Sequence, residues 1–217
     1  LPGLGIPVGE PAVNPTPRKM IVNEIRSLSE DGYDITISVE NGEELATRTF
    51  NYKVGVVNGI SIIGTSGIVS PLSNEAFVES IGRELQVAKA IGCTSIGFAS
   101  GKKGENALKE QEPSLRVIHY GNFVGEALKK AHCMGFKRVV LGIMIGKAVK
   151  LAEGHLNTHS HLVSADLSKW GVTMARELWD IMPPSFFAEI EEKCLNSCRT
   201  VFPDGELEVR LIRDLTV

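Results

Sequence analysis

Long apolar runs are missing from this sequence: no run approaches the roughly 20 residues that a membrane-spanning helix needs. The chain also lacks the basic segment followed by an apolar one that opens a secretion signal. Its net charge of −3 gives no general attraction to nucleic acid. We therefore expect a cytoplasmic protein whose partners include neither a membrane nor a nucleic acid.

Cysteine is scarce too, with 4 residues in 217, and no C-x-x-C motif occurs. Cys194 and Cys198 lie one turn apart on a predicted helix, which is a poor geometry for a disulfide. We expect reduced thiols. Disorder is not expected either, because 43% apolar and 23% charged residues are typical of a folded globular protein.

The first 53 residues predict a small α+β unit. Residues 1–17 are rich in proline and glycine, and we interpret them as a loop within a longer protein. A helical spacing of apolar residues follows over 17–30, then a strand-like alternation over 33–41 and a short helix over 42–51. These elements are too few to close a core. We therefore predict that residues 1–53 are the C-terminal part of an α+β domain.

From residue 54 the pattern changes to apolar strands that alternate with helices. Such strands favour a parallel sheet covered on both faces. We predict a Rossmann-like α/β domain over residues 54–217, closed by a charged strand suited to a sheet edge. The expected strands are 59–63, 94–100, 115–120, 138–146 and 206–214, and the expected helices are 73–91, 102–111, 122–135, 146–153, 167–180 and 185–200.

Four glycine-bearing loops follow the predicted strands: Gly64–Gly67, Ser100–Asn106, Gly121–Glu126 and Gly146–His161. Ligands of parallel sheets bind beyond the carboxyl ends of the strands, where backbone N–H groups receive anions and polar groups. A glycine after a strand is also ordinary turn geometry, but four such loops together favour a crevice for a large polar cofactor. No loop contains G-x-G-x-x-G or G-x-x-x-x-G-K-[ST], which argues against hydride transfer and nucleotide hydrolysis.

Histidines gather in the stretch GHLNTHSH. His155 and His159 are four residues apart, so on a helix they would share a face and could bind a metal ion. No H-E-x-x-H motif occurs, however, and NTHS favours a loop or a helix cap. His159 could instead bind substrate or move a proton near neutral pH. Metal binding, substrate or proton handling and capping all stay open here, whereas His119 and His132 suggest no special role.

Lysines lie on the same predicted edge of the sheet. Ordinary solvation of a surface explains them, but a ligand with several carboxylates would also favour such a rim. The residues are Lys102, Lys103, Lys147 and Lys150.

Three blocks carry a family resemblance: PGLGIPVGEPAVNPTPRKMI, GISIIGTSGIVSPLSNEA and GKAVKLAEGHLNTHS. They closely resemble signature blocks of the CbiD family, the cobalt-precorrin-5B (C1)-methyltransferases of anaerobic cobalamin (vitamin B12) biosynthesis. The blocks occur in order, and the similarity runs along nearly the whole chain. It implies S-adenosylmethionine as the methyl donor and a corrinoid acceptor rich in carboxylates. It implies no protein-bound metal, because the cobalt belongs to the substrate.

The resemblance also implies roles for particular residues. His159 is the candidate base for a ring N–H proton. The family's glycine and hydroxyl loop corresponds to Gly64, Thr65, Ser66 and Gly67, which we expect to contact the donor. From the glycine-bearing loops, and not from the resemblance, we also expect the donor to contact Gly101, Gly104, Asn122 and Gly125. The corrinoid is expected to contact Lys147, Lys150, Asn157, Thr158 and His159.

Two departures from the family pattern accompany the resemblance. Family members begin with a further α+β segment, which we expect to be needed for activity. In addition, His161 takes the place of a basic residue, and Asp166 comes later than the family's aspartate. A homo-oligomer stays open. The alternative functions are a non-catalytic corrinoid-binding fragment and a zinc-dependent hydrolase that uses His155 and His159.

Overall fold

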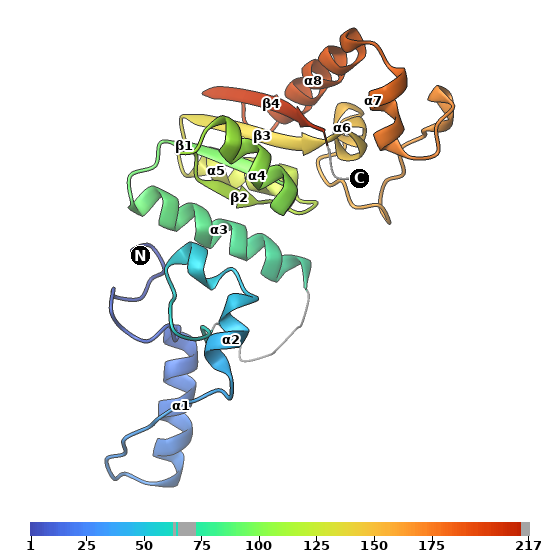
Figure 1. Ribbon diagram of the computed structural model, residues 1–217. Coiled ribbons are helices and arrows are strands. Elements are labelled where there is room, and N and C mark those ends of the chain that lie inside the picture. Colours follow the sequence, from blue (N-terminus) through green and yellow to red (C-terminus); the bar gives the residue numbers. More distant parts are fainter. Residues whose placement is uncertain (63, 65–72, 214–217) are drawn as a thin grey trace. The chain divides into compact units, whose positions relative to one another are not determined.

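The computed structural model describes residues 1–62, 64 and 73–213 (Figure 1). The chain forms two compact units, Leu1–Phe77 and Val78–Val217, called unit 1 and unit 2 below. The division falls inside helix α3 (Asn74–Ala90), later along the chain than the domain boundary that the sequence predicts after residue 53.

Unit 1 consists of short helices joined by irregular chain. Helix α1 (Pro15–Leu28) begins at Pro15, whose fixed φ and missing N–H suit the first helical position. It is followed by α2 (Gly42–Thr47) and by the 3₁₀ turn η1 (Asn51–Val54). Both helices predicted in this unit are therefore present.

The two strands predicted in unit 1 are wrong. Residues 33–39 belong to no strand, although Ile35 and Ile37 alternate with polar residues, and both side chains are nearly half exposed. In the described part of residues 59–63, Ile62 forms only an isolated parallel bridge, with Val13. The alternation predicts a half-buried face, but a strand also needs a neighbouring strand for its backbone hydrogen bonds.

A groove of about 810 Å³ lies in unit 1. Its apolar lining includes Ile21 and Val22 from α1, and Ile35 and Ile37 from the irregular stretch. Several apolar residues of this unit therefore line an open groove.

Unit 2 is built on a parallel sheet (Figure 1). Its strands are β1 (Ser95–Ala99), β2 (Val117–His119), β3 (Arg138–Met144) and β4 (Glu206–Ile212), in the order β2-β1-β3-β4. Each pairing is parallel. The α/β prediction is confirmed, and the charged last strand lies at a sheet edge as expected.

The helices of unit 2 largely follow the prediction. Besides most of α3, they are α4 (Lys102–Gln111), α5 (Val124–Cys133), α6 (Ile145–Ala152) and α8 (Pro184–Arg199). In the part of the chain that the structure describes, no helix combines the length and the apolar character needed to cross a membrane.

The single helix predicted over residues 167–180 is wrong. The chain forms two 3₁₀ turns, η2 (Ser168–Trp170) and η3 (Ala175–Glu177), and the short helix α7 (Leu178–Ile181). Gly171 between the turns has a φ of 70°, a left-handed conformation that ends a helix.

The core of unit 2 lies along the central strands. Phe98 on β1 and Leu141 on β3 have no exposed surface, and all buried apolar side chains among the described residues belong to this unit. A Cβ at Gly142 would lie 2.9 Å from Cγ of Leu108, so this glycine lets α4 pack directly on β3. The sheet and its helices thus form a dense support for the loops at the strand ends.

The four cysteines are free thiols. Cys194 and Cys198 are buried on α8, and this burial raises the pKa of both thiols. These two cysteines therefore contribute to the apolar core of unit 2.

Candidate functional site

The carboxyl ends of the strands define where a ligand can bind in unit 2. The chain passes from β1 to β2 on one side and then to β3 on the other side of β1, so the strand order reverses between β1 and β3. Ligands of open α/β sheets bind beyond the carboxyl ends of the strands at such a reversal. Three of the four predicted loops follow β1, β2 and β3. The fourth follows no strand of this sheet: Gly64 lies in unit 1, and Thr65, Ser66 and Gly67 lie outside the described residues.

Lys147, in the first turn of α6, contacts the loop after β2. Its Nζ donates hydrogen bonds to the carbonyl oxygen of Gly121 at 2.5 Å and to Oδ1 of Asn122 at 2.6 Å. Burial, together with the nearby charge of Lys150, lowers the pKa of Lys147 to about 8. The half-buried Lys147 therefore joins α6 to the loop after β2 at the carboxyl edge.

Thr158 brings a third segment to the same place. Its backbone N–H donates to the carbonyl oxygen of Asn122 at 3.0 Å, and Nζ of Lys150 donates to the Thr158 carbonyl oxygen at 3.3 Å. The residue is only 2% exposed, and its buried Oγ1 has no hydrogen-bond partner among the described residues. A buried hydroxyl normally has a partner, so this hydroxyl is left unsatisfied in the part of the chain that the structure describes.

Gly125 allows the segment before Thr158 to approach α5. Its N–H donates to the carbonyl oxygen of Leu156 at 2.9 Å, and a Cβ at position 125 would lie 2.8 Å from Cβ of Leu156. Any side chain here would therefore push residues 156–158 away. Packing of the loop explains this glycine.

The other two glycines predicted for the donor lie at the start of α4. Gly101 is its N-cap residue, and a Cβ there would meet no atom within 4 Å, so its surroundings are open. Gly104 is buried, and a Cβ there would lie 3.2 Å from Cβ of Ala99 on β1. Gly104 thus serves the contact between α4 and the sheet, whereas Gly101 faces free space at the carboxyl edge.

His159 is held by hydrogen bonds within its own loop. Its backbone N–H donates to Oδ1 of Asn157 at 3.1 Å, and its Nδ1 accepts the backbone N–H of His161 at 3.2 Å. The rings of His159 and His161 are stacked with centroids 5.2 Å apart. Because Nδ1 acts as an acceptor, the neutral imidazole carries its proton on Nε2. In this arrangement His159 offers a ligand a donor.

The geometry that suggested a zinc ion does not occur. His155 lies in a turn after α6 and His159 in the following loop, so the two do not share a helix face. Among the described residues, no group of three or more His, Cys, Asp or Glu side chains could hold a metal ion.

A charged cluster that the sequence did not predict lies beside this edge. Glu105 on α4 is buried, and its Oε2 lies 3.0 Å from Nε2 of His119, the last residue of β2. Lys102 and Lys109 contact the same carboxylate. The spacing of the three charges along one helix was visible in the sequence, but the contact with His119 depends on how α4 packs on the sheet.

The structure therefore brings one set of predicted residues together at the carboxyl edge. Three segments contribute them: the loop after β2, helix α6 and the loop that follows α6. The residues are Asn122, Lys147, Lys150, Asn157, Thr158 and His159.

Comparisons with known proteins agree with the sequence blocks. The CbiD family model matches residues 1–71. A cobalt-precorrin-5B C(1)-methyltransferase of Prosthecochloris aestuarii is 40% identical over 98% of this chain and 66% of its own length. One from Thermoanaerobacter sp. is 48% identical over 76% of this chain and 46% of its own length. This chain thus spans between about half and two thirds of these relatives.

A solved structure also matches. The crystal structure of a cobalamin biosynthesis protein (CbiD) from Archaeoglobus fulgidus is 28% identical and covers 64% of this chain and 46% of its own chain. The TM-score of 0.29 is too low for an argument about the fold.

Proposed function

This chain belongs to the CbiD family, and on that premise we propose that its protein transfers a methyl group from S-adenosylmethionine to carbon 1 of the corrinoid cobalt-precorrin-5B. One observation carries the proposal: Asn122, Lys147 and Thr158 come together at the carboxyl edge, next to the reversal of strand order. Such an edge is the ordinary ligand site of an open α/β sheet.

The chemistry of the residues suits this substrate pair. S-adenosylmethionine supplies an electrophilic sulfonium methyl group, and its transfer needs alignment of donor and acceptor more than acid–base help. Lys147 and Lys150 provide positive charge for the acidic side chains of the corrinoid. The open space at Gly101 provides further room for a ligand.

We propose that the donor binds at the loop after β1, where Gly101 is open. A donor contact with Gly64, Thr65, Ser66 and Gly67 stays a prediction. Gly104 and Gly125 support this arrangement through packing, because each lies close to a neighbouring residue. No protein-bound metal is required, since the cobalt belongs to the acceptor. The cytoplasm is the compartment we propose for the reaction.

The lysines allow a direct test of acceptor binding. Titration with cobyrinic acid, a corrinoid with free carboxylates, should show roughly tenfold weaker binding for Lys147→Gln or Lys150→Gln. The loss should shrink at 1 M salt, where charges are screened within about 3 Å. Lys129→Gln, an exposed lysine on α5, is the control and should bind like the wild type. Equal affinity of all variants would overturn the proposed site, and a loss independent of salt would indicate structural damage.

His159 offers a second test, which separates an anchor from a base. Because Nε2 is a donor in this arrangement, we propose that His159 anchors the acceptor, and His159→Asn should keep most of the activity through its amide N–H. If His159 were instead the base, His159→Asn should slow methyl transfer roughly 10²- to 10⁴-fold. His159→Val should weaken acceptor binding in either case. The assay needs a protein that includes the further segment present in the relatives.

A non-catalytic corrinoid-binding role is the second candidate, because the chain spans only part of the relatives. It predicts that these 217 residues bind cobyrinic acid but do not turn over S-adenosylmethionine. Turnover by this chain alone would exclude that alternative.

A further inference from the structure

A buried carboxylate on α4 holds two lysines of the same helix. Glu105 is 2% exposed, and its Oε1 lies 2.8 Å from Nζ of Lys109 while its Oε2 lies 3.2 Å from Nζ of Lys102. Nε2 of His119 lies 3.0 Å from Oε2 of Glu105. These four residues are called the Glu105 cluster below. Both carboxylate oxygens are thus engaged, as burial of a charge requires.

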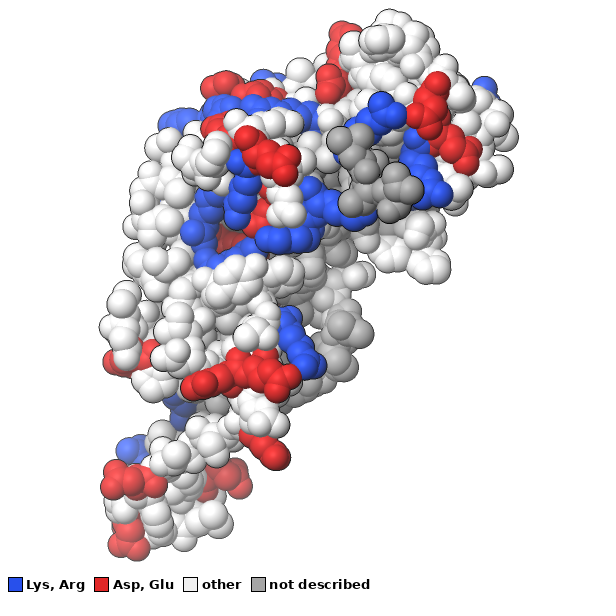
Figure 2. All heavy atoms as spheres, in the orientation of Figure 1, with Lys and Arg blue, Asp and Glu red and all other residues white. Residues whose placement is uncertain are grey.

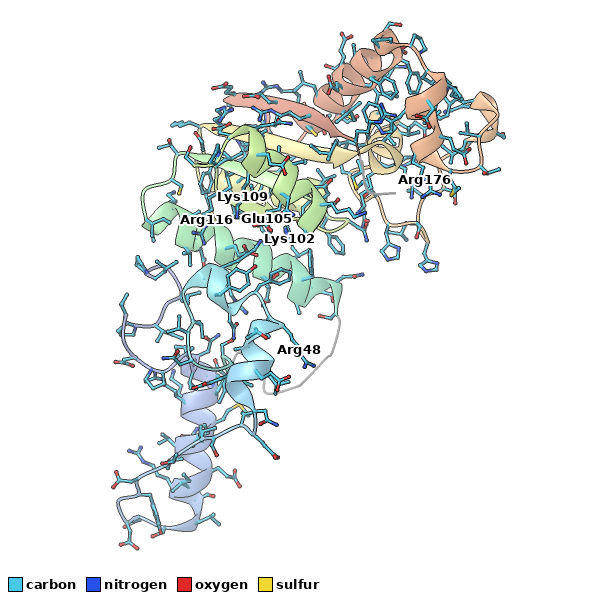
Figure 3. The ribbon with its side chains drawn as sticks, viewed as in Figure 1. Arg48, Lys102, Glu105, Lys109, Arg116 and Arg176 are labelled. Carbon is cyan, nitrogen blue, oxygen red and sulfur yellow. The ribbon has the colours of Figure 1, made fainter. Side chains whose placement is uncertain are left out.

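The Glu105 cluster has more positive charge than the buried carboxylate needs. One lysine would neutralise Glu105, yet Lys102 and Lys109 both contact it (Figure 3). Figure 2 shows Lys and Arg side chains around an acidic centre over this side of unit 2. The local balance therefore favours an anion from solution.

The two lysines are exposed where they would meet such an anion. The side chain of Lys102 is 66% exposed and that of Lys109 is 47% exposed. An ammonium group has three N–H donors, and the contact with Glu105 uses one of them. The remaining donors of each lysine face solvent.

Glu105 also fixes the positions of these donors. Free lysine side chains lose rotamer entropy when they bind a ligand. Lys102 and Lys109 are held by different oxygens of a single buried carboxylate, so part of that loss has occurred before any ligand arrives. The arrangement is pre-organised in a way that scattered surface lysines are not.

The position of the cluster relates it to the proposed site. Lys102 follows Gly101 directly after β1, and His119 ends β2, so both lie at the carboxyl edge of the sheet. Lys109 lies two helical turns further along α4. Protection of β2, an edge strand, would explain charged side chains here, but it would not require a buried carboxylate that holds two of them.

We propose that Lys102 and Lys109 form a second carboxylate-binding site, with Glu105 as the residue that positions them. The identity of the ligand rests on the proposed function: one acidic side chain of the corrinoid would bind here, apart from the group held at Lys147. The wider chemical class is a polycarboxylate.

The experiment compares cobyrinic acid with its heptamethyl ester, which has the same ring and no free carboxylates. The double variant Lys102→Gln/Lys109→Gln should lower affinity for the acid roughly 3- to 20-fold, as expected for two exposed charge pairs. Its affinity for the ester should not change. The matched control is Lys129→Gln/Lys137→Gln, which removes two exposed lysines elsewhere in unit 2.

Glu105→Gln tests the positioning role. It should lower the preference for the acid over the ester while leaving ester binding unchanged, and Glu105→Asp should restore part of that preference. General damage to the fold would weaken the binding of both compounds. If Glu105→Gln does not fold, the lysine double variant still decides the proposal.

The outcomes separate this proposal from the proposed function. An unchanged preference for the acid in the lysine double variant overturns the second site, even if Lys147→Gln weakens binding. If the wild type binds neither corrinoid, the proposed function fails, and citrate titration followed by NMR of the lysine side chains decides the second site. Citrate-induced shifts at Lys102 and Lys109 would support it, and their absence would overturn it.

Discussion

Unit 1 and unit 2 belong to one chain but differ in how they use their apolar residues. Among the described residues of unit 1, none is buried, and its strand-like stretch faces a groove. Unit 2 has a sheet whose two central strands are buried except at one or both end residues. The charges differ as well: the first 77 residues contain 5 Lys and Arg against 9 Asp and Glu, whereas the two kinds nearly balance in unit 2. Apolar patterning therefore produces a core only where neighbouring strands or helices are available to complete it.

Matched isoleucine substitutions should give the largest difference between the units. Ile96, on the central strand β1, is fully buried, whereas Ile37 is about half exposed. Ile96→Ala should lower the free energy of unfolding by about 2–5 kcal/mol because it leaves a cavity. Ile37→Ala should change it by less than about 0.5 kcal/mol. Urea unfolding measures both, and similar losses would show that unit 1 has a core of its own.

Matched glycine substitutions should sharpen the comparison at a smaller scale. Gly125→Ala places a Cβ 2.8 Å from Leu156 and should cost about 1–3 kcal/mol, as overpacking usually does. At Gly64 in unit 1 the nearest atom would be Cγ of Pro17 at 3.6 Å, an ordinary contact, so Gly64→Ala should be nearly neutral. Thermal unfolding of the two variants tests this order, and the reverse order would contradict it.

The smallest expected effect is a pH dependence that originates in unit 2. The pKa of Lys147 is lowered from 10.5 to about 8 in the folded protein. Between these values the unfolded chain binds more protons than the folded one, so stability rises with pH. Below about pH 8 the lysine is charged in both states, and the full cost of its burial remains.

Substitution of this lysine should remove the pH effect. Lys147→Met should flatten the rise in unfolding free energy between about pH 8 and 10, as measured by urea unfolding at several pH values. Lys53→Met in unit 1 is the matched control and should keep the wild-type profile. A rise that persists in Lys147→Met would mean that another group causes it.

The sequence predicted the fold of unit 2 well because its signals are local. The apolar runs of β1 and β3 and the amphipathic spacing of α4 and α5 can each be recognised without knowledge of their neighbours. Ile35 and Ile37 show the limit of such signals, since a strand depends on a partner that the alternation does not supply. The helix predicted over residues 167–180 was wrong for a different reason: the left-handed conformation of Gly171 interrupts an otherwise helical pattern.

The candidate site was predicted as a set of loops, but its internal contacts were not. The sequence indicated Lys147 and Thr158 as polar residues after a strand. It did not indicate that both would bind Asn122, because that contact joins segments about 25 and 36 residues apart. His119 was missed for the same reason, since its partner Glu105 lies on the preceding helix. The donor residues Thr65, Ser66 and Gly67 stay predictions.

The pairing of β3 with β4 has a consequence for the synthesis of this chain. Arg138 pairs with Glu206, so β3 leaves the ribosome 68 residues ahead of its neighbour. At a synthesis rate of about 5–20 residues per second, the edge of β3 that pairs with β4 stays unpaired for roughly 3 to 14 seconds. That edge presents the apolar run Val139–Ile143, which is the kind of open strand that other nascent chains can join. The interval before β4 arrives is thus the period in which this chain most needs protection by a chaperone.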